Sequence, residues 1–336
     1  MSNSEITVAL LLGGASTERS VSKHSANGVL KALRTLAYNV VLIDPSYGKN
    51  QPKNERDFFT EYDFSLVSAE NYVDAINANY LNGVDVIFNA LHGTWGEDGK
   101  VQSLLEFKDI PYTGSGILAS AVSMDKNITK SIIKHSGVNT ANWILIKKSN
   151  CNLLEIHKKI TEEFNFPLVV KPNDQGSAIG LSICADFYEL DKGIDEAFQF
   201  SNYILIEQYI AGYEVTVGII DNHVLPIVEI KPKHSFYDYE CKYTSGMSEY
   251  EVPANLPIEV TKMLQSEALL AYNSVGCQSY GRIDFRLDKD FNPFCLEINT
   301  LPGLTSTSLL PKAAKADGIS FEELINKIIR NTLTKL

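Results

Sequence analysis

Apolar runs alternate with helical patterns in the N-terminal third of the chain. Ile6–Leu12 is an apolar run that ends in Gly13-Gly14, as expected of a strand buried on both faces. Val40–Ile43 and Val84–Ala90 are two further runs of this kind. The positions that recur at helical spacing after the first run are Val21, Ser25, Val29, Leu30 and Leu33. This alternation predicts a parallel sheet with crossover helices.

The rest of the chain mixes strands, hairpins and helices. The segment Tyr47–Asn82 is polar and weakly periodic, which predicts a surface insertion with some helix, and a Pro- and Gly-rich stretch at 111–116 predicts a domain boundary. The predicted strands are Phe166–Pro172 and Ile204–Gln208, and the predicted hairpins are Ala211–Ile220 with Val224–Ile230 and Arg282–Asp288 with Pro293–Ile298. The predicted helices are a segment at 131–136 that ends at Gly137, then Glu259–Ser274 and Phe321–Leu333.

Composition narrows the class of protein. The chain has 336 residues, of which 44% are hydrophobic and 21% charged, which excludes a disordered or fibrous protein. Its length suggests roughly two domains of about 150 residues, with three small ones or one large one as alternatives. The 30 Lys and Arg against 41 Asp and Glu give a net charge of −11, which argues against a general binder of nucleic acid or anionic membranes. An anionic small substrate would need local lysines and arginines in a cleft.

No apolar run approaches the roughly 18 residues that span a bilayer, and the first run follows Glu5 rather than a basic segment. The five cysteines are scattered and odd in number, without a Cys-x-x-Cys; they are Cys151, Cys184, Cys241, Cys277 and Cys295. A disulfide framework or a zinc site is therefore not expected, and we predict a cytoplasmic protein.

A candidate metal site lies on the last predicted hairpin. Glu297 and Asn299 share one face of their strand because strand side chains alternate, and Asp284 can join them from the partner strand. Carboxylate and amide oxygens suit Mg²⁺. The alternative is an ordinary exposed strand face with solvated charges. The flanking apolar residues Ile283, Phe285, Leu296 and Ile298 indicate that the opposite face packs into a core.

A candidate phosphate site follows the strand that carries Lys171. This lysine ends an apolar run, and the loop 173–180 contains two glycines whose neighbouring amides can wrap phosphoryl oxygens. The loop has neither the Walker A pattern nor Gly-x-Gly-x-x-Gly. The alternative is a hairpin turn with a surface lysine.

Four further features permit either a functional or a structural interpretation. The strand 204–208, with Glu207, runs into a connecting segment that leads to Glu214. The backbone of this connection would suit an adenine edge and the carboxylate beyond it the ribose hydroxyls; the alternative is a linker with two solvated glutamates. The aromatic stretch 236–243 suits a lid or a packed surface loop. His92 follows a strand in a loop with three glycines, and Glu18 lies near a helix start, where the helix dipole favours an acid in any case.

The order of these motifs resembles the D-alanine–D-alanine ligase family of the ATP-grasp superfamily from about residue 6 to residue 332. The motifs are Gly-Gly-x-Ser-x-Glu-Arg-x-Val-Ser at 13–22, Ala-Leu-His-Gly at 90–93, Gly-Glu-Asp-Gly at 96–99, Pro-Tyr-Thr-Gly-Ser-Gly at 111–116, Met-Asp-Lys at 124–126, Val-Lys-Pro at 170–172, Phe-Tyr-Asp-Tyr-Glu at 236–240, Lys-Tyr at 242–243, Gly-Arg-Ile-Asp at 281–284 and Glu-Ile-Asn-Thr-Leu-Pro-Gly-Leu-Thr at 297–305.

The resemblance implies an α/β protein of three domains. These are an N-terminal parallel-sheet substrate domain at 1–121, a central ATP-grasp domain at 122–212, and a C-terminal ATP-grasp domain with the metal site and lid at 213–336. ATP would lie between the central and C-terminal sheets. The residues implied for ATP are Lys126, Lys171, Glu207, Tyr209, Ile210, Glu214, Phe236 and Lys242. Those implied for two Mg²⁺ ions, with Mn²⁺ as a possible substitute, are Asp284, Glu297 and Asn299.

The implied reaction is the ATP-dependent ligation of two D-alanines through an acyl phosphate, for peptidoglycan precursors. The resemblance assigns the tetrahedral oxyanion to Arg282 and the Gly303 amide. It assigns a hydrogen-bonded set to Glu18, Ser177 and Tyr243, with Glu18 on the first substrate's ammonium. The further substrate residues are His92, Lys242, Ser308 and Leu309. The family also suggests a homodimer, and no nucleic-acid or membrane partner.

The phosphate loop departs from the family pattern at Ala178, where a second serine is usual, so one phosphate contact is in doubt. Two alternatives stay open. The first is a related ligase that uses D-serine or D-lactate as second substrate, although Tyr243 after Lys242 matches the dipeptide-forming branch. The second is a nucleotide-binding relative without turnover, which missing metal ligands or a missing Arg282 would favour.

Overall fold

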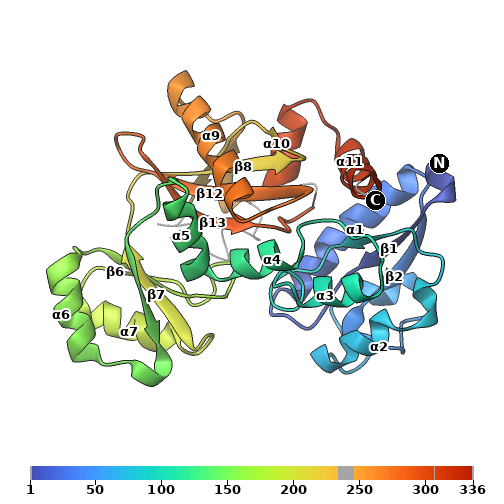
Figure 1. Ribbon diagram of the computed structural model, residues 1–336, viewed down its shortest axis with the longest axis horizontal. Helices are drawn as coiled ribbons and strands as arrows, with labels where there is room; N and C mark the ends of the chain where they lie inside the picture. The colour runs from blue at the N-terminus through green and yellow to red at the C-terminus, as the bar shows by residue number, and fades with distance from the viewer. Residues whose placement is uncertain (1, 234–245, 306, 335–336) are drawn as a thin grey trace.

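The computed structural model describes residues 2–233, 246–305 and 307–334. Three sheets follow one another along the chain and form the two-lobed arrangement of Figure 1. The second sheet along the chain lies in one lobe, and both chain ends lie in the other. No helix in these ranges is long and apolar enough to cross a membrane. Phe236, Lys242 and Tyr243, which the sequence places in the site, lie outside the described residues.

The first sheet is parallel and has the order β2-β1-β3, as predicted. Its residues are so apolar because helices cover it: Val8, Leu10 and Leu11 of β1 are all fully buried. Its strands are β1 (Thr7–Leu11), β2 (Asn39–Ile43) and β3 (Val86–Asn89). Its helices are α1 (Arg19–Thr35), α2 (Tyr72–Ile76), α3 (Lys100–Phe107) and α4 (Ile117–Met124).

The segment 47–82 contains the predicted helix and lies largely at the surface, but it also adds side chains to the core. It forms α2 and several short 3-10 helices, which are Pro45–Tyr47, Glu55–Phe58, Ala69–Asn71 and Asn79–Leu81. Some of its aromatic side chains are buried: Phe58 and Tyr72 are at most 5% exposed and complete the apolar clusters around the first sheet, whereas Tyr62 is 86% exposed. Weak periodicity concealed this burial because short helical turns present single apolar side chains rather than a stripe.

The second sheet is antiparallel, in the order β4-β7-β5-β6. The loop 173–181 joins the inner strand β5 to the edge strand β6. Its apolar face packs on α6 and α7, whereas Lys171 and Glu207 lie on the opposite face. The strands are β4 (Trp143–Lys147), β5 (Leu168–Pro172), β6 (Ser182–Cys184) and β7 (Tyr203–Gln208), and the helices are α5 (Lys126–His135), α6 (Leu153–Glu163) and α7 (Phe187–Ala197).

The third sheet is antiparallel, in the order β11-β10-β8-β12-β13, with the short β9 paired to β8. Both predicted hairpins are present, and the return strand of the first is interrupted between β9 and β10. The strands are β8 (Tyr213–Ile220), β9 (His223–Val224), β10 (Val228–Pro232), β11 (Ser248–Glu251), β12 (Tyr280–Leu287) and β13 (Pro293–Asn299). The helices are α9 (Ile258–Ser274), α10 (Leu309–Ala316) and α11 (Phe321–Leu333).

Two apolar clusters join regions that are distant in the chain. One combines the first sheet and α1 with α10, α11 and one end of the third sheet, so the N- and C-terminal parts share a core. The other packs α9 under the third sheet and includes Ile133 and Val138, although these two residues precede the second sheet in sequence. Helices α4 and α5 lie between the three sheets (Figure 1). The domain boundaries at 121 and 212 stay predictions.

Candidate active site

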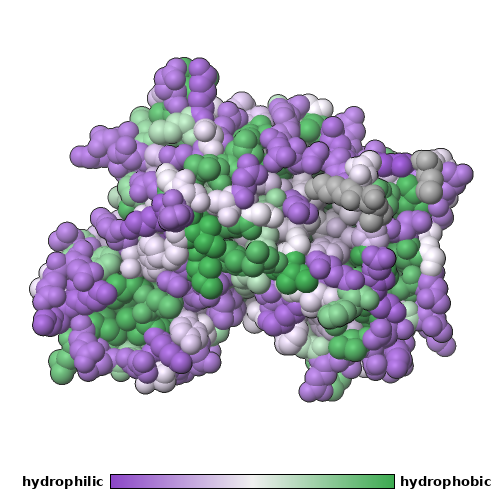
Figure 2. All heavy atoms as spheres, viewed as in Figure 1, coloured by the Kyte–Doolittle hydropathy of each residue, from purple (hydrophilic) through white to green (hydrophobic). Residues whose placement is uncertain are grey.

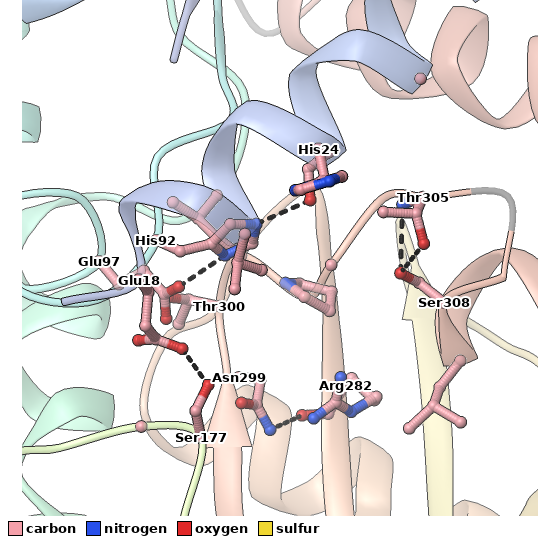
Figure 3. A pocket seen from close by; sticks show the side chains of 18 of the residues that line it. Glu18, His24, His92, Glu97, Ser177, Arg282, Asn299, Thr300, Thr305 and Ser308 are labelled. Carbon is pink, nitrogen blue, oxygen red and sulfur yellow. Dashed lines mark hydrogen bonds and ion pairs between the residues drawn. The ribbon is translucent and has the colours of Figure 1, made fainter. Parts of the chain in front are cut away.

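One cavity of about 660 Å³ is lined by α1, the loop after β3, the loop between β5 and β6, the hairpin β12–β13 and the loop that leads to α10. Figure 3 shows Ser177 directed at Glu18, with Asn299 and then Arg282 to the right of Ser177. Ten of the residues that the sequence places in the site line this cavity. They are Glu18, His92, Lys126, Ser177, Arg282, Glu297, Asn299, Gly303, Ser308 and Leu309.

Glu18 and Ser177 join the N-terminal part of the chain to the phosphate loop. Glu18 is the residue before α1 and is 9% exposed, and the Ser177 hydroxyl donates to its Oε1. A Cβ atom at Gly93 or Gly176 would come within 2.8 Å of Glu18 Oε2, so both glycines leave room for this carboxylate. The glycines on either side of the site therefore serve a close approach between two separate regions.

His92 is part of a buried chain of hydrogen bonds that the sequence did not predict. Its Nδ1 lies 3.0 Å from Glu97 Oε1 and its Nε2 3.0 Å from Ser25 Oγ, which also accepts from the Leu304 amide at 3.4 Å. Burial lowers the pKa of His92, but the hydrogen bond and charge of Glu97 outweigh burial and raise it overall. Glu97 thus fixes His92, and Ser25 connects it to the residue after Gly303.

The hairpin β12–β13 brings the three predicted metal ligands together. Asp284 pairs with Glu297 and Arg282 with Asn299 across the two strands. Both guanidinium nitrogens Nε and Nη2 of Arg282 donate to Asp284 at 2.8 Å, and Asn299 Nδ2 donates to Asp284 Oδ2 at 3.0 Å. Thr216 on β8 donates to the other oxygen of Asp284. The carboxylate is therefore held from three sides.

An irregularity in this hairpin decides which side chains face the site. The pairing shifts between Asp284 and Phe285, so that Cys295 pairs with Phe285 although Glu297 pairs with Asp284. A regular strand would direct Cys295 and Glu297 to one face. Instead Cys295 is fully buried in the core cluster, where we expected Leu296, and Leu296 lies outside that cluster. The prediction for Leu296 is wrong because alternation alone does not show a bulge.

The phosphate loop combines a left-handed backbone with a nearby lysine. Ser177 and Ala178 have φ angles of +53° and +57°, which non-glycine residues seldom adopt. This left-handed backbone determines the directions in which the amide N–H groups of the loop point. Lys126, at the start of α5, donates to the Gln175 carbonyl at 2.6 Å, and its Nζ lies 3.7 Å from Glu297 Oε2. Lys126 therefore lies between the loop and the candidate metal ligands.

Lys171 and Glu207 form a buried ion pair on the second sheet. Lys171 Nζ lies 2.5 Å from Glu207 Oε1, and Lys130 Nζ lies 3.0 Å from Glu207 Oε2. Burial alone would raise the pKa of Glu207, but the charges of the two lysines outweigh burial and lower it to about 2. Glu207 is therefore ionised at neutral pH and shared by two cations.

The connection between β7 and β8 is fixed by Arg286. Its Nε donates to the Ile210 carbonyl at 3.0 Å, its Nη2 donates to the Gly212 carbonyl at 3.0 Å, and its Nη1 lies 3.2 Å from Glu214 Oε2. The guanidinium also lies over the Tyr209 ring, 5.6 Å from its centroid. Glu214 is thus placed beside Tyr209 and Ile210, as the nucleotide interpretation requires.

The loop after β13 carries the last predicted residues. Ser308 precedes α10, and its Oγ accepts from the Thr305 amide at 3.1 Å. A Cβ atom at Gly303 would meet this Oγ at 3.0 Å, so the loop folds tightly back on the helix start. Gly303, Ser308 and Leu309 all face the cavity.

Lys130, which is fully buried, and Arg286 and Glu97, which are partly buried, are charged residues at the site that sequence reasoning missed. A signal existed for Lys130, because it lies at helical spacing from the buried positions Lys126 and Ile133. Within the described ranges no group of three or more His, Cys, Asp and Glu side chains is placed to hold a metal ion. The predicted ligand set has only two carboxylates and an amide, and Cys151, Cys184, Cys277 and Cys295 are free thiols.

Comparison with known proteins places this geometry in a class. A solved D-alanine–D-alanine ligase from Bacillus anthracis, complexed with ATP, is 33% identical and aligns over 98% of both chains with a TM-score of 0.77. The fold is therefore that of the ATP-grasp enzymes, and the chain is an ATP-dependent ligase. The family models for the D-ala D-ala ligase N-terminus and C-terminus match residues 7–115 and 132–330. The chain belongs to the D-alanine–D-alanine ligase family.

Two further proteins are similar to this chain over nearly their whole length. The D-alanine–D-alanine ligase of Syntrophotalea carbinolica is 42% identical over 324 residues, which cover 96% of this chain and 94% of that protein. The structure of the VanG D-Ala:D-Ser ligase from Enterococcus faecalis is 27% identical and aligns over 97% of this chain and 99% of that one, with a TM-score of 0.80. The predicted family and fold class are confirmed.

Proposed function

We propose that this chain joins two D-alanines into D-alanyl-D-alanine at the expense of ATP, as a step in peptidoglycan precursor synthesis. The contact between Glu18 and Ser177 is the observation that carries the proposal. A buried carboxylate suits the ammonium group of an amino acid, and the strained loop beside it suits a phosphoryl group. A D-alanine held by Glu18 would thus present its own carboxylate to the γ-phosphate of ATP.

ATP would lie between the second and third sheets, with Lys126 and Lys171 on its phosphates. Glu207 supports an adenine site because its buried carboxylate lies at the end of β7, beside the connection to β8, and carboxylate oxygens have lone pairs beyond those used by one lysine each, so one of them can also accept from the exocyclic amine. The Ile210 amide likewise donates to no acceptor in those ranges and suits a ring nitrogen of adenine. Glu214 would hold the ribose hydroxyls.

Asp284, Glu297 and Asn299 fit Mg²⁺, and we propose that they hold two such ions, with Mn²⁺ as a substitute. Their carboxylate and amide oxygens are hard ligands on one face of a hairpin, and a site with few protein ligands suits an ion that keeps phosphate and water as its other ligands. The ions would neutralise charge on the transferring phosphoryl group.

The first chemical step would join the carboxylate oxygen of D-alanine to the γ-phosphorus, while the bond from that phosphorus to the β,γ-bridging oxygen breaks and releases ADP. Glu18 would orient the ammonium group of this D-alanine, and Lys126 and Lys171 would stabilise the transferring phosphoryl group. The product of this step is an acyl phosphate.

In the second step, the free amine of another D-alanine would attack the acyl carbon, and inorganic phosphate would leave. Arg282 and the Gly303 amide would stabilise the oxyanion of the tetrahedral intermediate. Ser308, Leu309 and the start of α10 would hold the carboxylate of the second D-alanine, since helix N-termini favour anions. His92 would border the first substrate.

The experiment is phosphate release from Mg-ATP with D-alanine alone, with D-alanine plus D-serine, with D-alanine plus D-lactate, and with L-alanine, with products identified by mass. We expect ADP, phosphate and the D-alanyl-D-alanine dipeptide from D-alanine alone. A mixed product formed in preference to the dipeptide would move the chain to the D-serine or D-lactate branch. Nucleotide binding without phosphate release in every mixture would overturn the ligase proposal.

We also propose that the enzyme is a cytoplasmic homodimer. Its free thiols suit a reducing compartment. Figure 2 shows apolar side chains gathered over α4 and α5, and the exposed apolar residues of these two helices include Leu118 at 74% and Ile128 at 44%. Light scattering after size-exclusion chromatography would test the dimer, and Leu118→Glu tests this surface: a dimer that persists in the variant excludes it as the interface.

A further inference from the structure

Lys130 is completely buried on the inner face of α5, where a charged side chain is costly. It is 0% exposed, and burial lowers its pKa despite the nearby carboxylate of Glu207. An apolar residue at this position would avoid the cost of burying a charge. The contacts of Lys130 therefore need a reason beyond packing.

Three groups surround the ammonium of Lys130. Its Nζ lies 3.0 Å from Glu207 Oε2, donates to Thr140 Oγ1 at 2.7 Å and lies 5.2 Å from the centroid of the Trp143 ring. The carboxylate, the hydroxyl and the aromatic face all stabilise a cation. Lys130 is thus held as a charged group beside the proposed adenine ligand.

The charge balance at Glu207 depends on Lys130. Glu207 contacts Lys171 through one oxygen and Lys130 through the other, so two positive charges share one negative charge and the cluster carries one excess positive charge. Without Lys130, Glu207 and Lys171 would form a neutral pair. Lys171 would then have little charge left for a phosphate, and its ammonium would be drawn toward Glu207.

A second connection runs from Lys130 to the metal-bearing hairpin. Thr140, which accepts from Lys130, donates to the Cys295 carbonyl at 2.7 Å. The Cys295 amide in turn donates to the Asn139 carbonyl at 2.8 Å. Cys295 lies two residues before Glu297, at the bulge that turns Glu297 toward the site. Lys130 is therefore connected to both halves of the proposed nucleotide cleft, directly at Glu207 and through Thr140 at Cys295.

We infer that Lys130 is a positioning residue for ATP: it takes up half of the Glu207 charge, so that Lys171 keeps its positive charge for the phosphates. This inference rests on the proposed function for the identity of the nucleotide. It assigns Lys130 no contact with ATP. Its effect is exerted through Glu207, and it should therefore concern phosphate-bearing ligands more than the nucleoside.

The test compares Lys130→Met with Lys134→Met, a matched control from the exposed face of the same helix whose ammonium lies 5.5 Å from the centroid of the same Trp143 ring. Calorimetry with ADP and with adenosine measures binding without turnover, so it can be read even if the wild type does not ligate D-alanine. We expect K130M to weaken ADP binding at least about tenfold and adenosine binding far less, because a buried charge partner is lost. K134M should bind both like the wild type.

Steady-state kinetics gives a second measurement. In K130M the KM for ATP should rise about as much as the dissociation constant for ADP, while the KM for D-alanine should stay within about twofold of the wild type. Unchanged ADP affinity in a folded K130M, or an equal loss for adenosine and ADP, would overturn the inference in favour of a purely structural lysine. Lys130→Gln serves the same comparison if the methionine variant does not fold.

A double-variant cycle tests whether Lys130 acts through Glu207. In a Glu207→Gln background the carboxylate that competes for Lys171 is already absent. Adding K130M there should change ADP affinity by less than about threefold, since the two variants affect one interaction. Independent, multiplying losses would contradict the proposed route.

Discussion

The second and third sheets carry charged clusters of opposite character. At the second sheet, Lys130 of α5 and Lys171 of β5 share the single carboxylate of Glu207, which leaves one positive charge in excess. The hairpin of the third sheet pairs the carboxylates of Asp284 and Glu297 with the single guanidinium of Arg282, which leaves one negative charge in excess on the hairpin itself; Lys126 of α5 approaches it from outside, with its Nζ 3.7 Å from Glu297 Oε2. We call the two the positive and the negative sheet after the side chains in these clusters.

The comparison shows how one cleft can treat a polyphosphate in two ways. A positive excess binds phosphate directly, whereas a negative excess binds it only through a cation. In both clusters the minority ion fixes the geometry of the majority, because like charges at such short range would otherwise repel. The sheets are therefore not interchangeable, and substitutions on them should have different consequences.

The largest effect is expected on the negative sheet. Asp284→Asn keeps the shape of the side chain but removes one of two carboxylates, so the site should hold Mg²⁺ poorly. We expect kcat to fall by about 1,000-fold or more, since metal ions supply several kcal/mol to phosphoryl transfer. Phosphate release at rising Mg²⁺ concentration measures this. The control is Glu249→Gln, which removes an exposed carboxylate from β11 of the same sheet, and equal activity of the two variants would refute the assignment.

The positive sheet should be recognised by its response to acid. The pKa of Glu207 is lowered from 4.5 to about 2, so its ion pairs stabilise the fold above pH 4.5 and this contribution is lost as the pH falls from 4.5 toward 2. The loss amounts to roughly 3 kcal/mol for this buried group. Glu207→Gln should be less stable at neutral pH, and its unfolding free energy should fall less steeply with acid. Urea unfolding at a series of pH values measures both slopes, and parallel curves would contradict the ion-pair assignment.

A smaller effect is expected at the contact between Glu18, the residue before α1, and Ser177 in the loop after β5. Ser177→Ala removes a hydrogen bond to the Glu18 carboxylate, and such bonds to charged groups contribute about 1.5–3 kcal/mol. We expect the KM for D-alanine to rise about tenfold or more, with a lesser change in the KM for ATP. Steady-state kinetics with each substrate varied separates the two values. Ser149→Ala, at an exposed serine of the same part of the chain, should behave as the wild type.

The smallest effect concerns the departure from the family at Ala178. Its φ angle of +57° directs the backbone amides of the loop, so we expect the amides rather than a hydroxyl to contact phosphate. Ala178→Ser should therefore change the KM for ATP by less than about twofold. A large decrease in KM would show that the missing hydroxyl matters and that the positive sheet binds phosphate less completely than its charge suggests.

The sequence predicted most of the framework because its signals are local. The apolar run Ile6–Leu12 became β1, and both hairpins formed where turn residues separate alternating strands. Motif order then led to the family and to a set of residues of which ten line one cavity. The domain boundaries and the individual roles of these residues stay predictions.

The features that escaped prediction depend on contacts between distant residues. The bulge that buries Cys295 in place of Leu296 depends on how β13 pairs with β12, which alternation along one strand does not reveal. Lys130 contacts Glu207, which lies 77 positions further along the sequence, and only the fold shows that both lie in one buried cluster. The buried residues of the segment 47–82, among them Phe58 and Tyr72, fit no regular period, so the sequence pattern does not separate them from their exposed neighbours.

The core shared by the two ends of the chain has a consequence for the order of biosynthesis. The ribosome synthesises β1 and α1 long before α11, whose Leu324, Ile325 and Ile328 complete their apolar surface. The hydroxyl of Tyr38 donates to Asn326 at 2.7 Å across the same interface. The N-terminal sheet therefore stays partly uncovered until α11 has been translated. A polypeptide truncated before α11 would leave this apolar surface exposed and would be prone to aggregation.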